Sequence, residues 1–252
     1  MSRYYGPEIP FLLSHRGDRI HAIENTILAC ELSIKQGATA LEIDIRETGS
    51  GEIVVLHDYS LKRLFNKQGY VGRIGLAELK TYPFITGGNQ QSAFIDTLDD
   101  LFERFKNRLP INLDAKTIHF FDFKFADKII STIRNHNLFD TVWISCFNPF
   151  LLQILKLKNK RIRTGYLFQR MTWMHTMYDL ITFTDAWHPH HRVLNDYLMS
   201  KAVKQGKEIY VWTVNDMDIL QRVLDYPVHG IITDSPSLLR NHLVKTDVLK
   251  PG

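Results

Sequence analysis

Short apolar runs recur along the chain and alternate with segments in which apolar residues repeat with the period of a helix. The runs are nearly continuous, which is typical of parallel strands covered on both faces. The predicted strands are residues 11–14, 39–45, 110–114, 141–145, 163–167, 181–186, 208–214 and 230–233. The predicted helices are residues 26–36, 97–106, 123–136, 149–158, 172–180, 194–205, 217–225 and 237–244. This alternation predicts an α/β fold, the (β/α)8 TIM barrel.

One segment breaks the alternation. Residues 52–57 have the pattern of a strand, but only about six residues separate them from the strand ending at Ile45, whereas a parallel crossover needs a dozen or more. The intervening Thr48-Gly49-Ser50-Gly51 predicts a tight turn, so that the chain folds back as a hairpin and carries His57 to the mouth of the barrel. We therefore predict a distorted barrel, one domain over residues 1–252, with a small insertion after strand 2 at approximately 47–95 that covers this mouth.

Composition and charge narrow the class of protein. With 252 residues, 44% of them hydrophobic and 23% charged, the chain resembles an ordinary soluble globular protein. No run approaches the ~20 apolar residues that span a bilayer, and residues 1–13 lack the features of a secretory signal, so we predict a cytoplasmic protein without stable membrane insertion. The densest basic stretch, residues 156–163, has no interleaved aromatic residues and is interpreted as a solvated helix end, so no nucleic-acid partner is expected. The net charge of +4 suits a small anionic substrate. The sequence does not specify the oligomeric state.

Two carboxylates share one face of the strand predicted at residues 39–45. Alternate strand residues point to the same side, so Glu42 and Asp44 face one way and the apolar residues 41, 43 and 45 the other. Two carboxylates inside a barrel do not both stay ionised without a cation or strong donors, and oxygen ligands favour Mg²⁺ or Ca²⁺. An exposed edge strand with alternating charges is the alternative interpretation.

The same pattern recurs on the next predicted strand. Asn112, Asp114 and Lys116 share a face, which offers Asp114 as a third oxygen ligand and Lys116 as a point charge for a phosphoryl oxygen. A salt-bridged pair at a strand end is the structural alternative for Asp114 and Lys116.

Two histidines are predicted to meet at this mouth. His15 ends the first strand, in the position of a catalytic residue of a barrel, and is followed by Arg16, which can bind phosphate in a bidentate way. His57 arrives from the predicted hairpin, and two imidazoles near neutrality can act as acid and base at phosphorus. A lone histidine at a strand end is more often structural, but a second one beside a predicted cation site favours catalysis.

Two further features admit more than one interpretation. His188-Pro189-His190-His191 resembles a metal-binding tract, but Pro189 breaks the spacing and we interpret these histidines as lining a loop, with His188 open to the pocket as an alternative. Trp212, at the end of a predicted strand, is assigned either to core packing or to a wall of the substrate site.

Taken in order, several short motifs resemble the glycerophosphodiester phosphodiesterase family. They are Ser14-His15-Arg16-Gly17, Glu24-Asn25-Thr26, Leu41-Glu42-Ile43-Asp44, Leu56-His57-Asp58, Asn112-Leu113-Asp114-Ala115-Lys116, Ser145-Cys146-Phe147-Asn148, Val211-Trp212-Thr213-Val214-Asn215 and Thr233-Asp234-Ser235-Pro236. Each motif is unspecific alone, but the ordered set spans nearly the whole chain. The resemblance implies a distorted barrel and metal-dependent hydrolysis of glycerophosphodiesters to sn-glycerol 3-phosphate and an alcohol.

The resemblance also implies roles for particular residues. His15 and His57 become the catalytic acid–base pair, and the ligands of a divalent cation are Glu42, Asp44 and Asp114. The predicted substrate contacts are Arg16, Asn25, Lys116 and Trp212. The family usually has Glu where this chain has Asp114, so the third ligand is one methylene shorter here.

Two alternatives stand beside this function. A lysophospholipase D would act on substrates that keep one acyl chain and would need an apolar groove, for which the aromatic residues Phe65, Tyr70, Tyr82, Phe84 and Phe94 of the inserted segment are candidates. A phosphate-binding barrel without turnover is the non-enzymatic alternative.

Overall fold

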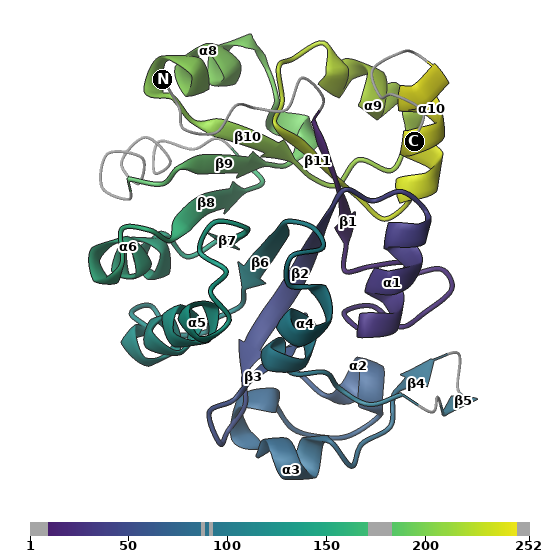
Figure 1. The fold of residues 1–252 in the computed structure, drawn as a ribbon, viewed down its shortest axis with the longest axis vertical. Coiled ribbons are helices and arrows are strands. Elements are labelled where there is room, and N and C mark those ends of the chain that lie inside the picture. The colour runs from purple at the N-terminus through teal and green to yellow at the C-terminus, as the bar shows by residue number, and fades with distance from the viewer. Residues whose placement is uncertain (1–9, 87–88, 91–92, 171–182, 246–252) are drawn as a thin grey trace.

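The protein, described from a computed structural model over residues 10–86, 89–90, 93–170 and 183–245, is a closed barrel of parallel strands (Figure 1). Around the barrel the strands are β1 (Phe11–His15), β2 (Ala40–Glu47), β6 (Ile111–Ala115), β7 (Val142–Cys146), β8 (Arg163–Phe168), β9 (Ala186–Pro189), β10 (Glu208–Val211) and β11 (Gly230–Thr233). Pairing of β1 with both β11 and β2 closes the ring. The predicted TIM barrel is thus confirmed.

Helices follow the strands and surround the barrel (Figure 1). They are α1 (Ile27–Lys35), α4 (Leu98–Phe105), α5 (Phe123–Asn135), α6 (Pro149–Lys158), α8 (Asp196–Gln205), α9 (Met217–Leu224) and α10 (Pro236–Lys245), with a 3-10 turn η2 (His191–Val193) after β9. Polar N-cap side chains fix where many of them begin, because each accepts a hydrogen bond from an N–H of the first turn; they are Thr26, Thr97, Asp122, Asn148, Asn195 and Asp216. Within the described ranges, no helix is long and apolar enough to cross a membrane.

The alternation of side chains on β2 separates two apolar layers. Leu41, Ile43 and Ile45 belong to the large cluster between the strands and the helices. Ala40 belongs to a smaller interior cluster that includes Trp143 and Tyr210 from other strands of the barrel. The inward positions nearer the carboxyl end of β2 are therefore free for Glu42 and Asp44, as the strand period requires.

The predicted hairpin after β2 is confirmed. β2 runs eight residues and then pairs antiparallel with β3 (Ile53–Val55), in a register that sets Ile45 opposite Val55. The turn is closed by a 2.9 Å hydrogen bond from the N–H of Thr48 to the carbonyl of Glu52, and Gly51 takes a left-handed φ of +97°. This hairpin returns the chain to the carboxyl end of the barrel two residues before His57.

The residues after β3 form a small substructure with its own apolar cluster. It contains α2 (Lys62–Phe65), the 3-10 turn η1 (Val71–Arg73), α3 (Leu76–Leu79), β4 (Ile85–Thr86) and β5 (Asn89–Gln90), and it lies beside β2 and β3 in Figure 1. Phe65 and Phe84 are buried in its apolar cluster, and their rings stack at 4.8 Å. These two aromatic residues therefore line no groove, contrary to the expectation for a lysophospholipase D.

One strand was misplaced by the sequence pattern. The strand predicted at 181–186 is β9 (Ala186–Pro189), which begins where the prediction ended. The reason is that an inward position of β9 carries His188, so the strand lacks the continuous apolar run that marks its neighbours. Strand β10 ends at Val211 and not at 214. The helix predicted at 172–180 lies outside the described residues.

Candidate active site

Three carboxylates from two neighbouring strands meet at the carboxyl end of the barrel. Glu42 and Asp44 project from β2, and the parallel register sets Asp114 of β6 beside Asp44. One carboxylate oxygen of each lies within 4.8 Å of the others, and all three side chains are buried. The structure thus brings together the three residues that the sequence suggested as cation ligands.

The surrounding charges act differently on the three carboxylates. Burial raises the pKa of Glu42 to about 8, and the negative charge of Asp44 contributes to this rise. Burial opposes ionisation of Asp44 as well, but the cations Lys116 and Arg16 outweigh it, so the pKa of Asp44 lies well below its usual range. Burial also raises the pKa of Asp114, despite the nearby Lys116. The negative charge of the cluster is therefore only partly balanced by side chains.

The donor set fits a hard divalent cation. Among the residues that the structure describes, no hydrogen bond reaches Glu42 Oε2, Asp44 Oδ1 or Asp114 Oδ1, although each atom is buried. Lys116 Nζ lies 3.1 Å from the Asp44 oxygen and so supplies part of the missing positive charge. Buried carboxylate oxygens without donors are costly unless a cation binds them, and oxygen-only ligands suit Mg²⁺ or Ca²⁺.

Two residues of the loop after β1 have a left-handed backbone conformation, and their side chains contact the carboxylate cluster. Arg16 has φ +64° and Asn25 has φ +57°, and the N–H of Asn25 donates to the carbonyl of Arg16 at 2.8 Å. The Asn25 amide donates to Asp44 Oδ2 at 2.9 Å and accepts from the Asp44 N–H at 3.0 Å. These two hydrogen bonds hold Asp44 in place, and the contact of Asn25 with substrate stays a prediction.

The imidazole ring of His15 is oriented by a hydrogen bond between its Nδ1 and a carboxylate. Its Nδ1 lies 2.6 Å from Asp234 Oδ1, while its Nε2 lies 4.0 Å from Glu42 Oε2. Asp234 accepts further hydrogen bonds from Arg19 at 2.9 Å and from Asn215 at 2.7 Å. Burial opposes protonation of His15, but Asp234 and Glu42 outweigh it and raise its pKa. The motif Thr233–Pro236 contains Asp234, but no local pattern predicts its contact with His15, because 219 residues separate the two.

The imidazole ring of His57 is oriented in the same way by the carboxylate of the next residue, Asp58. Its Nδ1 lies 2.8 Å from Asp58 Oδ1, and Asp58 accepts a hydrogen bond from Arg63 Nε at 2.5 Å. Arg63 also donates twice to Glu24, at 2.9 and 2.6 Å, and Glu24 accepts from Arg16 at 3.1 Å. A continuous chain of ion pairs therefore links the support of His57 to the loop that follows His15.

These groups surround one cavity of about 190 Å³ at the carboxyl end of the barrel. Its lining includes His15, Arg16, Glu42, His57, Asp114, Lys116 and Trp212, together with Asn112, Ser145, Phe147, Leu167, Gln169 and Ile232. The Trp212 indole donates to the carbonyl of His188 at 2.7 Å and meets the Phe147 ring edge-on at 5.6 Å, so it forms a fixed wall. In the described part of the chain, His57 is the only lining residue from the segment 47–95. The expectation that this segment covers the mouth stays a prediction.

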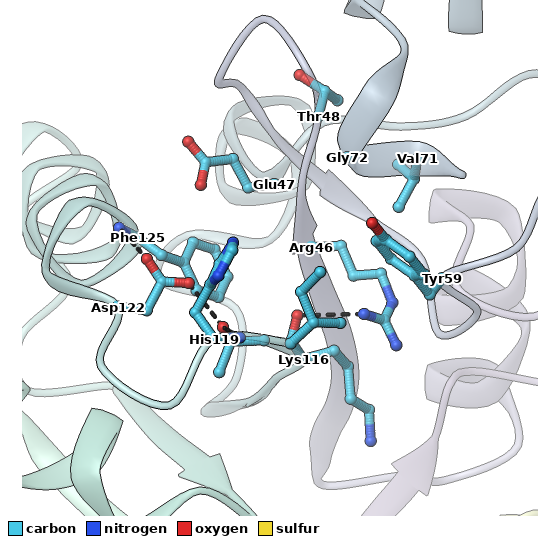
Figure 2. A pocket seen from close by; sticks show the side chains of 12 residues that line it. Arg46, Glu47, Thr48, Tyr59, Val71, Gly72, Lys116, His119, Asp122 and Phe125 are labelled. Atoms are coloured by element: carbon cyan, nitrogen blue, oxygen red, sulfur yellow. Dashed lines mark hydrogen bonds between the residues drawn. The ribbon is translucent and has the colours of Figure 1, made fainter. Parts of the chain in front are cut away.

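A second hollow, of about 100 Å³, has Lys116 in common with the lining of the catalytic cavity (Figure 2). Figure 2 shows Arg46 and Lys116 at its edge, joined by a hydrogen bond of 3.3 Å from Arg46 Nη1 to the Lys116 carbonyl. Arg46 Nε also donates to the carbonyl of His57 at 2.7 Å. Arg46 therefore ties the ends of β6 and of the hairpin together from outside the catalytic cavity.

The side chains of the histidine tract at the end of β9 do not line the catalytic cavity. His188 is fully buried inside the barrel and stacks on Tyr210 at 4.9 Å, and burial lowers its pKa to about 3. The His190 and His191 rings lie beside each other at 4.3 Å. In the described residues none of the three joins a group that could hold a metal ion, and none lines the catalytic cavity. The alternative that His188 opens to the pocket is therefore wrong.

Comparison with known proteins agrees with the fold and with the ordered motifs. The family model for the glycerophosphoryl diester phosphodiesterase family matches residues 15–238. A glycerophosphodiester phosphodiesterase of Caldanaerobacter subterraneus is 29% identical over 240 residues, which cover 91% of this chain and 96% of the relative.

Solved structures share the same barrel. A phosphodiesterase of Oleispira antarctica in complex with the product sn-glycerol-3-phosphate aligns with a TM-score of 0.83 at 24% identity, over 93% of this chain and 97% of that one. A glycerophosphodiester phosphodiesterase of Agrobacterium tumefaciens aligns with a TM-score of 0.79 at 22% identity, over 92% and 100%. Because the family model spans most of the sequence, the chain belongs to the glycerophosphoryl diester phosphodiesterase family of enzymes, as its motifs predicted.

Proposed function

We propose that this protein hydrolyses glycerophosphodiesters to sn-glycerol 3-phosphate and an alcohol, with a divalent cation bound by Glu42, Asp44 and Asp114. The observation that carries the proposal is the meeting of three buried carboxylates and two histidines at one cavity. Membership of the family supports the reaction, and so do relatives named for it. A cytoplasmic location and a single domain over residues 1–252 remain part of the proposal.

Glu42, Asp44 and Asp114 would hold the cation, Mg²⁺ or Ca²⁺, which would supply positive charge against the negative charge that develops on the phosphate. Around it, the chain supplies fixed positive charge. Lys116 lines the cavity with its ammonium group between Asp44 and Asp114, and Arg16 lines it from the loop after β1. We assign both to the phosphate, and Trp212 to the wall against which the substrate packs.

The two histidines are proposed to move the protons. Each has its Nδ1 beside a carboxylate, Asp234 for His15 and Asp58 for His57, which leaves Nε2 as the nitrogen that exchanges a proton with the reactants. One histidine removes the proton of the attacking hydroxyl, which belongs to water or to the 2-hydroxyl of the substrate. The other donates a proton to the oxygen of the departing alcohol. Attack by the 2-hydroxyl would form a cyclic phosphate, which a water molecule would then open to sn-glycerol 3-phosphate. Because a carboxylate contacts Nδ1 of each ring, the orientation of both rings is set before the substrate binds.

The test is a panel of glycerophosphocholine and glycerophosphoethanolamine with Mg²⁺, Ca²⁺ or Mn²⁺, followed by sn-glycerol 3-phosphate release. His15→Ala and His57→Ala should each lower kcat/KM by about 100-fold or more. His21→Ala is the matched control, because the His21 side chain is 63% exposed and is bound to Asp18 instead. A histidine variant within about threefold of the wild type contradicts the acid–base assignment. Release of no product with any cation would instead favour the phosphate-binding barrel.

A further inference from the structure

Glu24 is a buried carboxylate that contacts three arginines. Its side chain is only 7% exposed, and it accepts two hydrogen bonds from Arg63, at 2.9 and 2.6 Å, and one from Arg16, at 3.1 Å. Arg19 forms an ion pair with it at 3.7 Å. Burial opposes ionisation of Glu24, but Arg63 and the other two arginines outweigh it, so the pKa of Glu24 lies below its usual value. Glu24 is therefore negatively charged, and its hydrogen bonds with the arginines are of the strong, charge-assisted kind.

One path leads from Glu24 to His57. Arg63 donates to Glu24 with its two terminal nitrogens, and its Nε donates to Asp58 Oδ2 at 2.5 Å. The other oxygen of Asp58 lies 2.8 Å from Nδ1 of His57. Because the guanidinium is planar and rigid, the position of Asp58, and with it that of the His57 ring, depends on how Glu24 holds Arg63. We call Arg63 and Asp58 the His57 arm.

A second path leads from Glu24 to His15. Arg19 Nη2 lies 3.7 Å from Glu24 Oε2, while its Nη1 donates to Asp234 Oδ1 at 2.9 Å. The same oxygen of Asp234 lies 2.6 Å from Nδ1 of His15. We call Arg19 and Asp234 the His15 arm. Both arms begin at Glu24, so a single carboxylate connects the contacts that orient the two rings.

The backbone around Glu24 is fixed by the start of α1. Thr26 donates to the carbonyl of Ile23 at 2.8 Å and accepts from the N–H of Ala29 at 3.2 Å, which attaches the chain on both sides of Glu24 to this helix. Such an anchor suits a positioning role, because a displacement of about 1 Å at a reacting group can lower a rate about 100-fold.

We propose, building on the phosphodiesterase function proposed above, that Glu24 is a positioning residue that sets the orientation of both His57 and His15, each through its own arm. One histidine acts as the acid and the other as the base, so a substrate whose alcohol leaves without a proton depends on the base alone. Loss of the arm that serves the acid should then matter little for such a substrate, whereas loss of the other arm should matter as before. Loss of Glu24 weakens both arms.

The test measures the release of sn-glycerol 3-phosphate from glycerophosphocholine and from the 4-nitrophenyl ester of glycerol 3-phosphate, whose 4-nitrophenolate leaves without a proton. Arg63→Met and Arg19→Met should each lower kcat for glycerophosphocholine about tenfold or more. With the ester, one of these two variants should return to within about threefold of the wild type and the other should not. Glu24→Gln should lose more than either on glycerophosphocholine and keep a loss on the ester. KM should change less than about threefold, because Arg16 stays paired with Asp44 at 2.9 Å.

Glu31→Gln is the matched control, because Glu31 of α1 also accepts hydrogen bonds from two arginines, Arg104 and Arg108, which lie on and after α4 in the outer layer of helices. It should change kcat for both substrates less than about twofold. Arg63→Lys keeps the positive charge but loses the planar set of donors, so its loss should approach that of Arg63→Met.

A value of kcat for Glu24→Gln within about threefold of the wild type on glycerophosphocholine overturns the inference and leaves the proposed function in place. Losses of equal size on both substrates in all three variants also overturn it, because a general disturbance of the structure does not distinguish the leaving groups. Failure of the wild type to release product from either substrate contradicts the proposed function itself, and with it the inference. If the melting temperature shows that Glu24→Gln does not fold, the two arginine variants decide, since the side chains of Arg63 and Arg19 are both partly exposed.

Discussion

Cation binding is expected to expel a proton from Glu42. With no cation bound, burial and the charge of Asp44 raise the pKa of Glu42 to about 8, so this carboxyl carries a proton at pH 7. A cation needs the carboxylate form of its ligand, and binding is therefore coupled to loss of that proton. Because the proton competes with the cation below the pKa, the affinity for the cation should rise with pH up to about 8 and level off above it.

The size of the effect follows from the pKa of Glu42. At pH 7, one unit below a pKa of about 8, roughly nine in ten Glu42 carboxyls are protonated, so about 0.9 proton leaves for each cation bound. The pKa of Asp44 is low and adds nothing, whereas the raised pKa of Asp114 adds in the same direction. The apparent dissociation constant should fall about ninefold from pH 6 to 7 but only about twofold from pH 8 to 9.

Isothermal titration calorimetry in buffers of different ionisation enthalpy measures this proton release directly, since the slope of observed against buffer enthalpy is the number of protons. Mg²⁺ and Ca²⁺ are titrated into protein from which cations have been removed. Glu42→Gln is the matched control, because it keeps the shape of the side chain but has no proton to lose, and its slope should be much smaller. A wild-type slope near zero at pH 7, with an affinity independent of pH, refutes the reasoning.

Three further predictions concern the charges around the site. Asp234→Asn should lower kcat/KM at least about tenfold and shift the pH-rate limb of His15 toward acid, since Asp234 raises the pKa of His15; an unchanged pH profile contradicts the positioning role. Lys116→Met should lower the melting temperature in chelator, because Asp44 and Asp114 lose their shared counter-charge, and Mg²⁺ should raise it more than in the wild type; equal shifts contradict this. The protonated Glu42 contributes stability that is fully present below pH about 4.5 and is lost as the pH rises through its raised pKa of about 8. In chelator at pH 8, Glu42→Gln should therefore have a free energy of unfolding about 1 kcal/mol or more above that of the wild type. A melting temperature of this variant below that of the wild type contradicts this.

The barrel and its hairpin could be predicted because both depend on local signals. Continuous apolar runs identify parallel strands, and the short Thr48–Gly51 connection is incompatible with a crossover, which left a hairpin as the solution. The strand period then placed Glu42 and Asp44 on one inward face, as the structure has them. The strand β9 escaped the same reasoning, because its inward His188 interrupts the apolar pattern.

The hydrogen bonds that orient the site residues could not be predicted, because they join parts of the chain that are far apart in sequence. Asp234 reaches His15 only after the barrel closes between β11 and β1. The sequence showed Asn25 near the site but not that its left-handed backbone turns the amide onto Asp44. Likewise, no periodic pattern distinguishes the buried Phe84 of the inserted segment from the exposed Phe120 after β6. Which aromatic residues are buried is decided by tertiary packing.

The central claim is that the carboxylate cluster holds a cation on which glycerophosphodiester hydrolysis depends. The most direct measurement is the release of sn-glycerol 3-phosphate from glycerophosphocholine, by protein treated with chelator and then dialysed, before and after addition of Mg²⁺ or Ca²⁺. The account predicts no product from the treated protein, recovery with one of these cations, and no recovery for Glu42→Gln or Asp44→Asn. Full activity after removal of cations, or full recovery in both variants, would contradict it.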